Sequence, residues 1–242
     1  LGQKLGSLYN LMMDSVRLNR EGYAPLKPTL ARIAAIKSVR EYQIVTSQLD
    51  RRGDNTMMFG IGVGADMRNA SMNIVSIEQG GIGLGTRDYY LNDDAQTVKI
   101  REAYKAFMKK MFEMVGDAPA TAEKKMQAVM TIETRIAKAS YDKVTLRNIN
   151  KNYHKMSYTQ LVSDYPGIDW GNVFLQNGFP MFNEVDLGQP EPIHEVVKIL
   201  GDTPLDDLKA YAEAKVISGA ASHLSDVFRA EAFKFSSVMS GA

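Results

Sequence analysis

The sequence predicts a mainly α-helical, bundle-like lobe with one small β-hairpin, formed by a single domain over residues 1–242. Apolar residues recur at three- and four-residue steps through most of the chain, which is the period of an amphipathic helix. The period changes to two only within residues 57–78. No internal repeat, low-complexity segment or long linker divides the sequence, and its length can bury a sizeable core.

The composition narrows the classes of function. Hydrophobic residues make up 45% and charged residues 24%, which is ordinary for a globular chain. A formal net charge of +1 gives no basic excess for nucleic acid and no acidic tail for a cationic partner. The lack of cysteine excludes disulfides and thiolate metal sites. No apolar run reaches the roughly 20 residues of a membrane span, and any signal peptide or anchor would precede Leu1.

Two helices are expected before the hairpin. The first covers residues 3–20, where apolar side chains form one buried stripe, and it ends at Gly22 and Pro25. The second begins at Pro28, a residue suited to the first turn of a helix, and reaches about Leu49. The short connection predicts that the two helices are antiparallel neighbours.

The alternating region predicts the hairpin. Its strands cover residues 57–63 and 72–78, and residues 66–70 between them have turn chemistry. The preceding turn, residues 51–55, contains Arg-Gly-Asp at 52–54, which spells an adhesion motif. A polar turn before a strand explains these residues equally well, so we interpret them as a turn.

Two long helices are expected after the hairpin. The first begins at the N-cap Asn92, carries an apolar stripe that includes Phe107, and ends at Gly116. The second runs from about Thr121 to Tyr141. We interpret the methionines on both helices as core residues that tolerate irregular gaps, in preference to a groove for peptides.

Shorter elements precede a last long helix. Ser157 and Gln160 form a capping box for a short helix, and another short helix begins at Asp169. Residues 182–187 are expected to form an isolated edge strand. A final helix over residues 203–239 is expected to be the spine of the bundle.

Residues 80–91 have the most distinctive order in the chain. Glycine recurs there at every second position after an apolar strand, as G-x-G-x-G, whereas a dinucleotide-binding loop requires G-x-G-x-x-G followed at once by a helix. We therefore favour a backbone that turns tightly and packs closely because no Cβ is in the way. A nucleotide-dependent enzyme stays as an alternative. Arg87 and Asp88 are expected to hydrogen-bond neighbouring backbone and helix ends, without a role in catalysis.

The histidines do not form a complete zinc motif. His194-Glu195 is followed by Lys198 at the position of the second histidine of H-E-x-x-H, and a cation cannot replace a neutral imidazole beside zinc. His154 and His223 do not have ligand spacing. We therefore expect no catalytic, cofactor-binding or metal-binding residue in this chain, and interpret His194 as an exposed or partly packed helix residue.

Three segments carry a resemblance to a known family. Residues 81–91 read G-I-G-L-G-T-R-D-Y-Y-L, and residues 147–157 read R-N-I-N-K-N-Y-H-K-M-S. Residues 14–26 place Leu-Asn, Gly and Pro-Leu at a matching spacing. In the same order, these segments resemble the N-terminal part of the neprilysin and endothelin-converting-enzyme family of zinc metallopeptidases, and bacterial oligopeptidases of the O type look closest.

The resemblance implies a function that the residues alone do not. In this family the N-terminal region is a non-catalytic helical lobe that caps the zinc lobe and limits access to the cavity between them. The zinc motif, a downstream glutamate ligand and a substrate-gripping N-A-[YF] motif follow C-terminally, and none occurs here. The resemblance thus implies a piece of a zinc-dependent endopeptidase of oligopeptides that is inactive alone. Its partners would be the C-terminal catalytic lobe and peptide substrates, with zinc only in the full-length enzyme.

The resemblance also implies an extracytoplasmic place in a bacterium, periplasmic, surface-bound or secreted. A free-standing α-helical peptide-binding or scaffold module is the main alternative. The two hypotheses differ in whether the reading frame continues past Ala242 into H-E-x-x-H.

Overall fold

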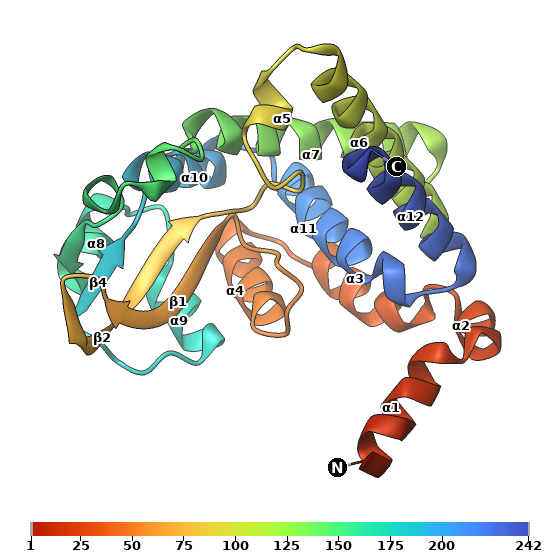
Figure 1. Ribbon diagram of the computed structural model, residues 1–242, viewed down its shortest axis with the longest axis horizontal. Helices are drawn as coiled ribbons and strands as arrows, with labels where there is room; N and C mark the ends of the chain where they lie inside the picture. The colour runs from red at the N-terminus through yellow and green to blue at the C-terminus, as the bar shows by residue number, and fades with distance from the viewer. Residues whose placement is uncertain (1, 242) are drawn as a thin grey trace.

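In the computed structural model, which describes residues 2–241, helices surround one end of a small sheet and extend beyond it (Figure 1). The helices are α1 (Gly2–Met13), α2 (Ser15–Glu21), α3 (Lys27–Ala34), α4 (Val39–Asp50), α5 (Asp88–Leu91), α6 (Ala95–Met114), α7 (Pro119–Ala139), α8 (Tyr158–Asp164), α9 (Trp170–Asn177), α10 (Pro190–Asp202), α11 (Leu205–Ala220) and α12 (Asp226–Ser240). The strands are β1 (Phe59–Asp66), β2 (Asn69–Gln79), β3 (Lys155–Ser157) and β4 (Glu184–Leu187). The mainly α class predicted from the sequence is confirmed.

Short polar side chains begin several of these helices. Asp94 caps α6 by accepting a hydrogen bond of 3.0 Å from the backbone N–H of Thr97. Ser157 caps α8 in the same way through the N–H of Gln160, at 3.1 Å, which confirms the predicted start of this helix. The N-cap of α6 therefore lies two residues after the expected Asn92, because the aspartate at 94 supplies the acceptor.

The sheet has four strands in the order β1-β2-β4-β3, so the expectation of a single hairpin is wrong. The hairpin itself is present, with β1 and β2 antiparallel. Strand β4 is not an isolated edge strand, because it lies between β2, to which it is parallel, and β3, to which it is antiparallel. The pairing of Ile77 with Leu187 joins distant parts of the chain, a contact that local periodicity does not reveal.

Two hydrophobic cores lie side by side and share α7 and α11. The first core joins the sheet to α3, α4, α9 and α10. The second is formed by α5, α6 and α12. On α11, Tyr211 belongs to the first core and Ile217 to the second. On α7, Ile136 belongs to the first core and Val129 to the second. These two helices are thus apolar on more than one side, as expected for helices buried between layers.

Three predicted helices are divided. The helix expected over residues 3–20 is interrupted at Asp14, and the described chain does not bury its predicted stripe, because no residue of α1 or α2 is buried. The helix expected from Pro28 to Leu49 is interrupted before Ser38, which caps α4. The helix expected over 203–239 is interrupted by a 3-10 turn at Ala221–His223, where the chain reverses direction so that α12 packs on α6 (Figure 1).

Within residues 2–241, no helix combines the length and the apolar character that crossing a membrane requires.

Candidate functional site

The glycine-rich loop, residues 80–87, runs from β2 to α5 and leaves no room for side chains at two positions. A Cβ atom on Gly81, whose φ is +81°, would lie 2.8 Å from the hydroxyl oxygen of Tyr211. That hydroxyl donates a hydrogen bond of 2.7 Å to the carbonyl of Gly81. A Cβ on Gly83 would lie 2.0 Å from the hydroxyl oxygen of Tyr104. The tight turn and close packing predicted for this segment are therefore confirmed.

A buried carboxylate lies beneath the loop. Glu133 of α7 is 0% exposed. It accepts hydrogen bonds from four groups: the Gly83 N–H at 3.1 Å, the Tyr104 hydroxyl at 3.2 Å, the Tyr90 hydroxyl at 2.6 Å and the Lys215 ammonium. We call these five residues the Glu133 cluster. It joins the loop to α5, α6, α7 and α11, and its charge is both paired and hydrogen-bonded, as a buried carboxylate requires.

The Glu133 cluster is suited to holding elements together and unsuited to proton transfer. Burial raises the pKa of the Tyr90 and Tyr104 hydroxyls, and the charge of Glu133 raises both further, so both stay protonated as donors. The loop N–H of Gly83 points to Glu133, and that of Leu84 points to the Tyr90 hydroxyl at 3.0 Å. A phosphate-binding loop would direct such N–H groups at its ligand, so the geometry disfavours the nucleotide alternative.

Arg87 links the loop to the end of a helix. Its Nη1 donates a hydrogen bond of 2.6 Å to the carbonyl of Ser140, which is the C-cap of α7. Asp88 lies in the first turn of α5, where its Oδ2 is 3.4 Å from the Thr86 hydroxyl. The predicted contact of Arg87 with a helix end is confirmed, and the absence of a catalytic role stays a prediction.

The segment 147–157 fastens the hairpin to the neighbouring strands. Asp66, 2% exposed, accepts a hydrogen bond of 2.8 Å from the Tyr153 hydroxyl, and its Oδ2 lies 3.3 Å from the Lys155 ammonium. The backbone N–H of Arg68 and then the Tyr153 hydroxyl lower the pKa of Asp66, because both stabilise its charged form. This distinctive segment therefore has a structural task at the tip of the hairpin.

The segment 14–26 is tied to the start of α12. The Asn19 side chain donates to Asp226 Oδ2 at 2.7 Å and accepts from the Asp226 backbone N–H at 2.8 Å. Gly22 ends α2 with a φ of +57°, a conformation that favours glycine. All three motif segments thus contribute polar contacts between elements that are distant in the sequence.

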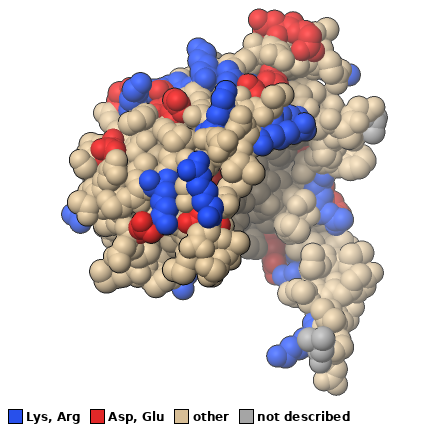
Figure 2. All heavy atoms as spheres, turned by 60° about the vertical axis from the view of Figure 1, so that its left-hand side comes forward, with Lys and Arg blue, Asp and Glu red and all other residues tan. Residues whose placement is uncertain are grey.

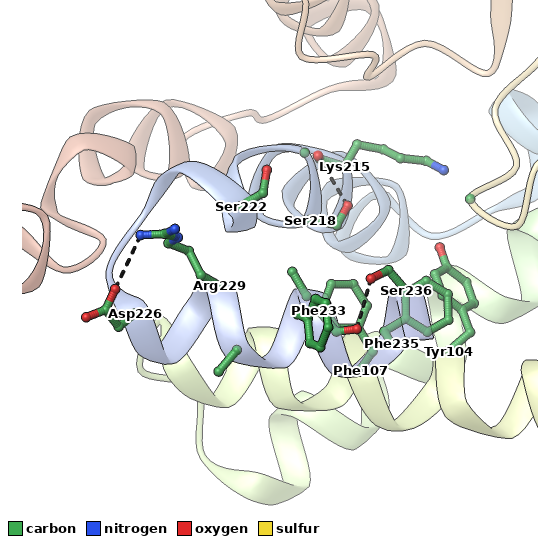
Figure 3. Close-up of a pocket in the computed structure, with 14 residues that line it drawn as sticks. Tyr104, Phe107, Lys215, Ser218, Ser222, Asp226, Arg229, Phe233, Phe235 and Ser236 are labelled. Atoms are coloured by element: carbon green, nitrogen blue, oxygen red, sulfur yellow. Dashed lines mark hydrogen bonds and ion pairs between the residues drawn. The ribbon is translucent and has the colours of Figure 1, made fainter. Parts of the chain in front are cut away.

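A cavity of about 880 Å³ lies between α11 and α12, and Gly83, Tyr104 and Lys215 of the Glu133 cluster line part of it (Figure 3). Three aromatic rings form its apolar wall: Phe107 of α6, and Phe233 and Phe235 of α12. Phe233 is 73% exposed and points into the space between the two helices (Figure 3).

Most polar side chains of this cavity already have partners within the chain. Arg229 lies 3.4 Å from Asp226 at one end. The hydroxyls of Ser218 and Ser236 donate to backbone carbonyls of their own helices, at 2.7 and 2.9 Å. The surface can therefore contact a ligand through shape and aromatic area, and these four polar side chains do not form a pair of nucleophile and base.

The three histidines lie on separate elements and do not come together at one site. His194 is exposed on α10, where its ring packs against Tyr165 with 4.4 Å between ring centroids, which confirms its interpretation as an exposed or partly packed helix residue. His154 Nδ1 is 2.9 Å from the carbonyl of Leu187, and His223 is exposed in the turn before α12. Within residues 2–241, no group of three or more His, Asp or Glu side chains is placed to hold a metal ion. These residues do not fit a zinc site, so no chemical step of this chain is assigned to zinc.

Sequence reasoning named Glu133 only as one position of an apolar helix stripe. A single carboxylate among Met130, Ile132 and Ile136 was the available signal, because an acidic residue on a buried face needs partners. The partners themselves come from four other segments, the glycine-rich loop, α5, α6 and α11, and could not be deduced from spacing.

Comparison with known proteins gives a family match along nearly the whole sequence. The model of peptidase family M13 matches residues 2–242. Endothelin-converting enzyme-like 1 of Mus musculus is 30% identical over 191 residues, which are 76% of this chain and 24% of that protein. Endothelin-converting enzyme 1 of Bos taurus is 28% identical over 208 residues, 82% of this chain and 26% of that protein. The chain spans about a quarter of the length of these curated relatives.

Solved structures agree with this match. The Mycobacterium tuberculosis zinc metalloprotease Zmp1 in complex with an inhibitor superposes with a TM-score of 0.90 and 26% identity, over 96% of this chain and 35% of that one. The same protease in its open state also superposes with a TM-score of 0.90 and 26% identity. That match covers 98% of this chain and 37% of the protease chain. PepO from Lactobacillus rhamnosis superposes with a TM-score of 0.77 and 17% identity, over 97% of this chain and 37% of the PepO chain. At this identity the likeness supports the fold alone.

Proposed function

Because the chain belongs to peptidase family M13, we propose that it is the N-terminal helical lobe of a zinc-dependent endopeptidase that hydrolyses oligopeptides. The family predicted from the three sequence segments is confirmed by these matches. In this proposal the zinc ligands and the catalytic base belong to the remainder of the longer protein, and the 242 residues are one domain without peptidase activity of their own.

In the proposal the lobe covers the catalytic cavity and limits the size of the substrate. The observation that carries this role is the cavity between α11 and α12, whose aromatic wall includes the exposed ring of Phe233. Aromatic area without a fixed set of unpaired charges can contact extended peptides of varied sequence, because burial of apolar surface is not directional. Such a wall would admit a flexible peptide and exclude a folded protein by shape.

We infer that the lobe is rigid, as a wall of the catalytic cavity requires. The two helices α7 and α11 are shared by both hydrophobic cores, and the Glu133 cluster ties the glycine-rich loop to four helices.

The proposal is tested by comparing the 242-residue chain with the full-length enzyme. We expect the full-length enzyme to cleave a quenched fluorescent peptide, to lose that activity with a chelator, and to spare folded proteins. The 242-residue chain should cleave neither substrate and should contain no stoichiometric zinc. Chelator-sensitive cleavage by the chain alone would contradict the proposal, and so would a full-length enzyme that ignores chelators.

The wall itself is tested by Phe233→Ala in the full-length enzyme. We expect KM for the peptide to rise several-fold, because an exposed ring facing the substrate is lost. Val144→Ala is the control, since Val144 is 77% exposed and lies outside the cavity. An unchanged KM with Phe233→Ala would show that the substrate does not contact this cavity.

Extracytoplasmic location in a bacterium is proposed on the family resemblance alone. Fractionation of the source cells, with detection of the protein in each fraction, tests it. Recovery in the cytoplasmic fraction would contradict it.

A further inference from the structure

Helix α1 carries apolar side chains that contact little of the described chain. Its exposed large apolar residues are between 52% and 64% exposed: Leu5, Leu8, Tyr9, Leu11, Met12 and Met13. The helix extends away from the body (Figure 1), and in the space-filling view the projecting arm has few charged atoms (Figure 2). An isolated helix of this length is marginal in water, so a tertiary contact is needed to hold it.

Four of the six exposed apolar residues of α1 share one face. At about 100° per residue, Leu5, Leu8, Tyr9 and Met12 fall within one arc of roughly 100°, and Gln3, Ser7 and Asn10 fall on the opposite side. Burial of large apolar side chains is favourable, so contact with another surface would stabilise this face.

The direction of α1 is fixed by its neighbour. Asp14 caps α2 through the N–H of Arg17 at 2.9 Å, and the Arg17 guanidinium donates to the Leu11 carbonyl of α1 at 3.0 Å. Helix α2 is in turn held to α12 by Asn19 and Asp226. The apolar face is therefore presented at a defined place beside the lobe.

We propose that this face of α1 is a docking surface for the part of the same polypeptide that carries the zinc site. The inference rests on the proposed function, and it adds the surface through which the two parts meet. The matched relatives are about four times longer than the region they share with this chain, so the remainder of such a protein has ample surface to cover α1.

The charge of α1 favours an apolar protein partner. Lys4 is the only charged side chain of the helix, so a partner with an apolar, uncharged surface is complementary. A membrane-surface helix would instead carry several Lys or Arg residues on its polar face. Contacts of this kind between large apolar faces are typical of permanent interfaces.

The test compares Leu8→Asp with Asn10→Asp in the full-length protein and in the 242-residue chain. Both variants add one negative charge to α1, on opposite faces. In the full-length protein we expect Leu8→Asp to lower Tm by several degrees and to speed tryptic cleavage within residues 4–17 about tenfold, because α1 opens more often. Asn10→Asp should change neither. In the 242-residue chain both variants should melt as the parent does.

Three results would overturn the inference. Leu8→Asp without effect in the full-length protein would mean that the face is not covered. An equal loss of Tm in both proteins would make α1 part of the core of the lobe. A dimer of the 242-residue chain that Leu8→Asp converts to a monomer would assign the face to a second copy. Loss of the proposed peptidase function would be seen separately, as a parent full-length protein without chelator-sensitive cleavage.

Discussion

Replacement of Glu133 by glutamine removes the charge at the centre of the Glu133 cluster while keeping its size. The Lys215 side chain is 11% exposed, so its ammonium would remain largely buried without a counter-ion. Loss of one partner of a buried pair costs about 3–5 kcal/mol. Lys215 lines the cavity, where water reaches it, so we expect the lower end, about 3 kcal/mol. The amide nitrogen also replaces the acceptor of the Tyr90 hydroxyl, which adds about 1 kcal/mol.

The assay is urea unfolding of the 242-residue chain, followed by far-UV circular dichroism. A loss of about 4 kcal/mol would be a large part of the 5–15 kcal/mol that holds a typical domain together. The double variant Glu133→Gln with Lys215→Met removes both charges and should recover much of that loss, since no buried charge is left unpaired. A single variant within about 1 kcal/mol of the parent, or a double variant no more stable than the single one, would refute this reasoning.

Three further predictions concern packing and pH. Phe107→Ala should destabilise the chain by about 3–5 kcal/mol in urea unfolding, because its ring is only 7% exposed within the second core. Gly83→Ala should lower Tm more than Gly85→Ala. A Cβ at 83 meets the Tyr104 hydroxyl, whereas one at 85 meets nothing within 4 Å and costs only the positive φ, about 1–2 kcal/mol. Asp66→Asn should lower Tm at neutral pH. The lowered pKa of Asp66 means that its contribution is present above the unfolded value of about 3.9 and is lost as pH falls through the folded value, so the two Tm curves should converge in acid.

Each of these has an outcome that contradicts it. A loss below about 1 kcal/mol with Phe107→Ala would mean that the ring does not pack in the core. Equal Tm values for the two alanine variants of the loop would show that the backbone at 83 can move away from Tyr104. A constant difference in Tm down to about pH 3 would show that the ionised form of Asp66 is not the stabilising one.

The sequence was informative where a structure depends on neighbours in the chain. The caps at Ser157 and Asp169, the apolar stripe through Phe107, the alternating hairpin and the glycine-rich turn all depend on residues within a few positions of one another. Local hydrogen bonds and local periodicity determine these elements, so reading the residues in order is enough to find them.

The predictions failed where a tertiary contact decides between two conformations that the local sequence allows equally. Apolar periodicity continues through Ala221–Ser225 as it does through a helix, yet the chain turns there so that α12 can pack on α6. The stripe of α1 has the pattern of a buried helix, but its pattern alone does not say what buries it. In the Glu133 cluster, Tyr90, Tyr104 and Lys215 come from three elements, and only the tertiary structure brings them to one carboxylate.

The parallel pairing of β2 with β4 has a consequence for biosynthesis. A ribosome delivers the hairpin long before Glu184–Leu187, so for much of translation one edge of β2 has no partner. Val75 and Ile77, 5% and 0% exposed in the finished fold, would then border an open edge that can pair with another nascent chain. Strand pairing between distant segments is also slow to form. Chains that end prematurely between α7 and β4 should therefore aggregate, and production of this protein should depend on how quickly its middle third is translated and shielded.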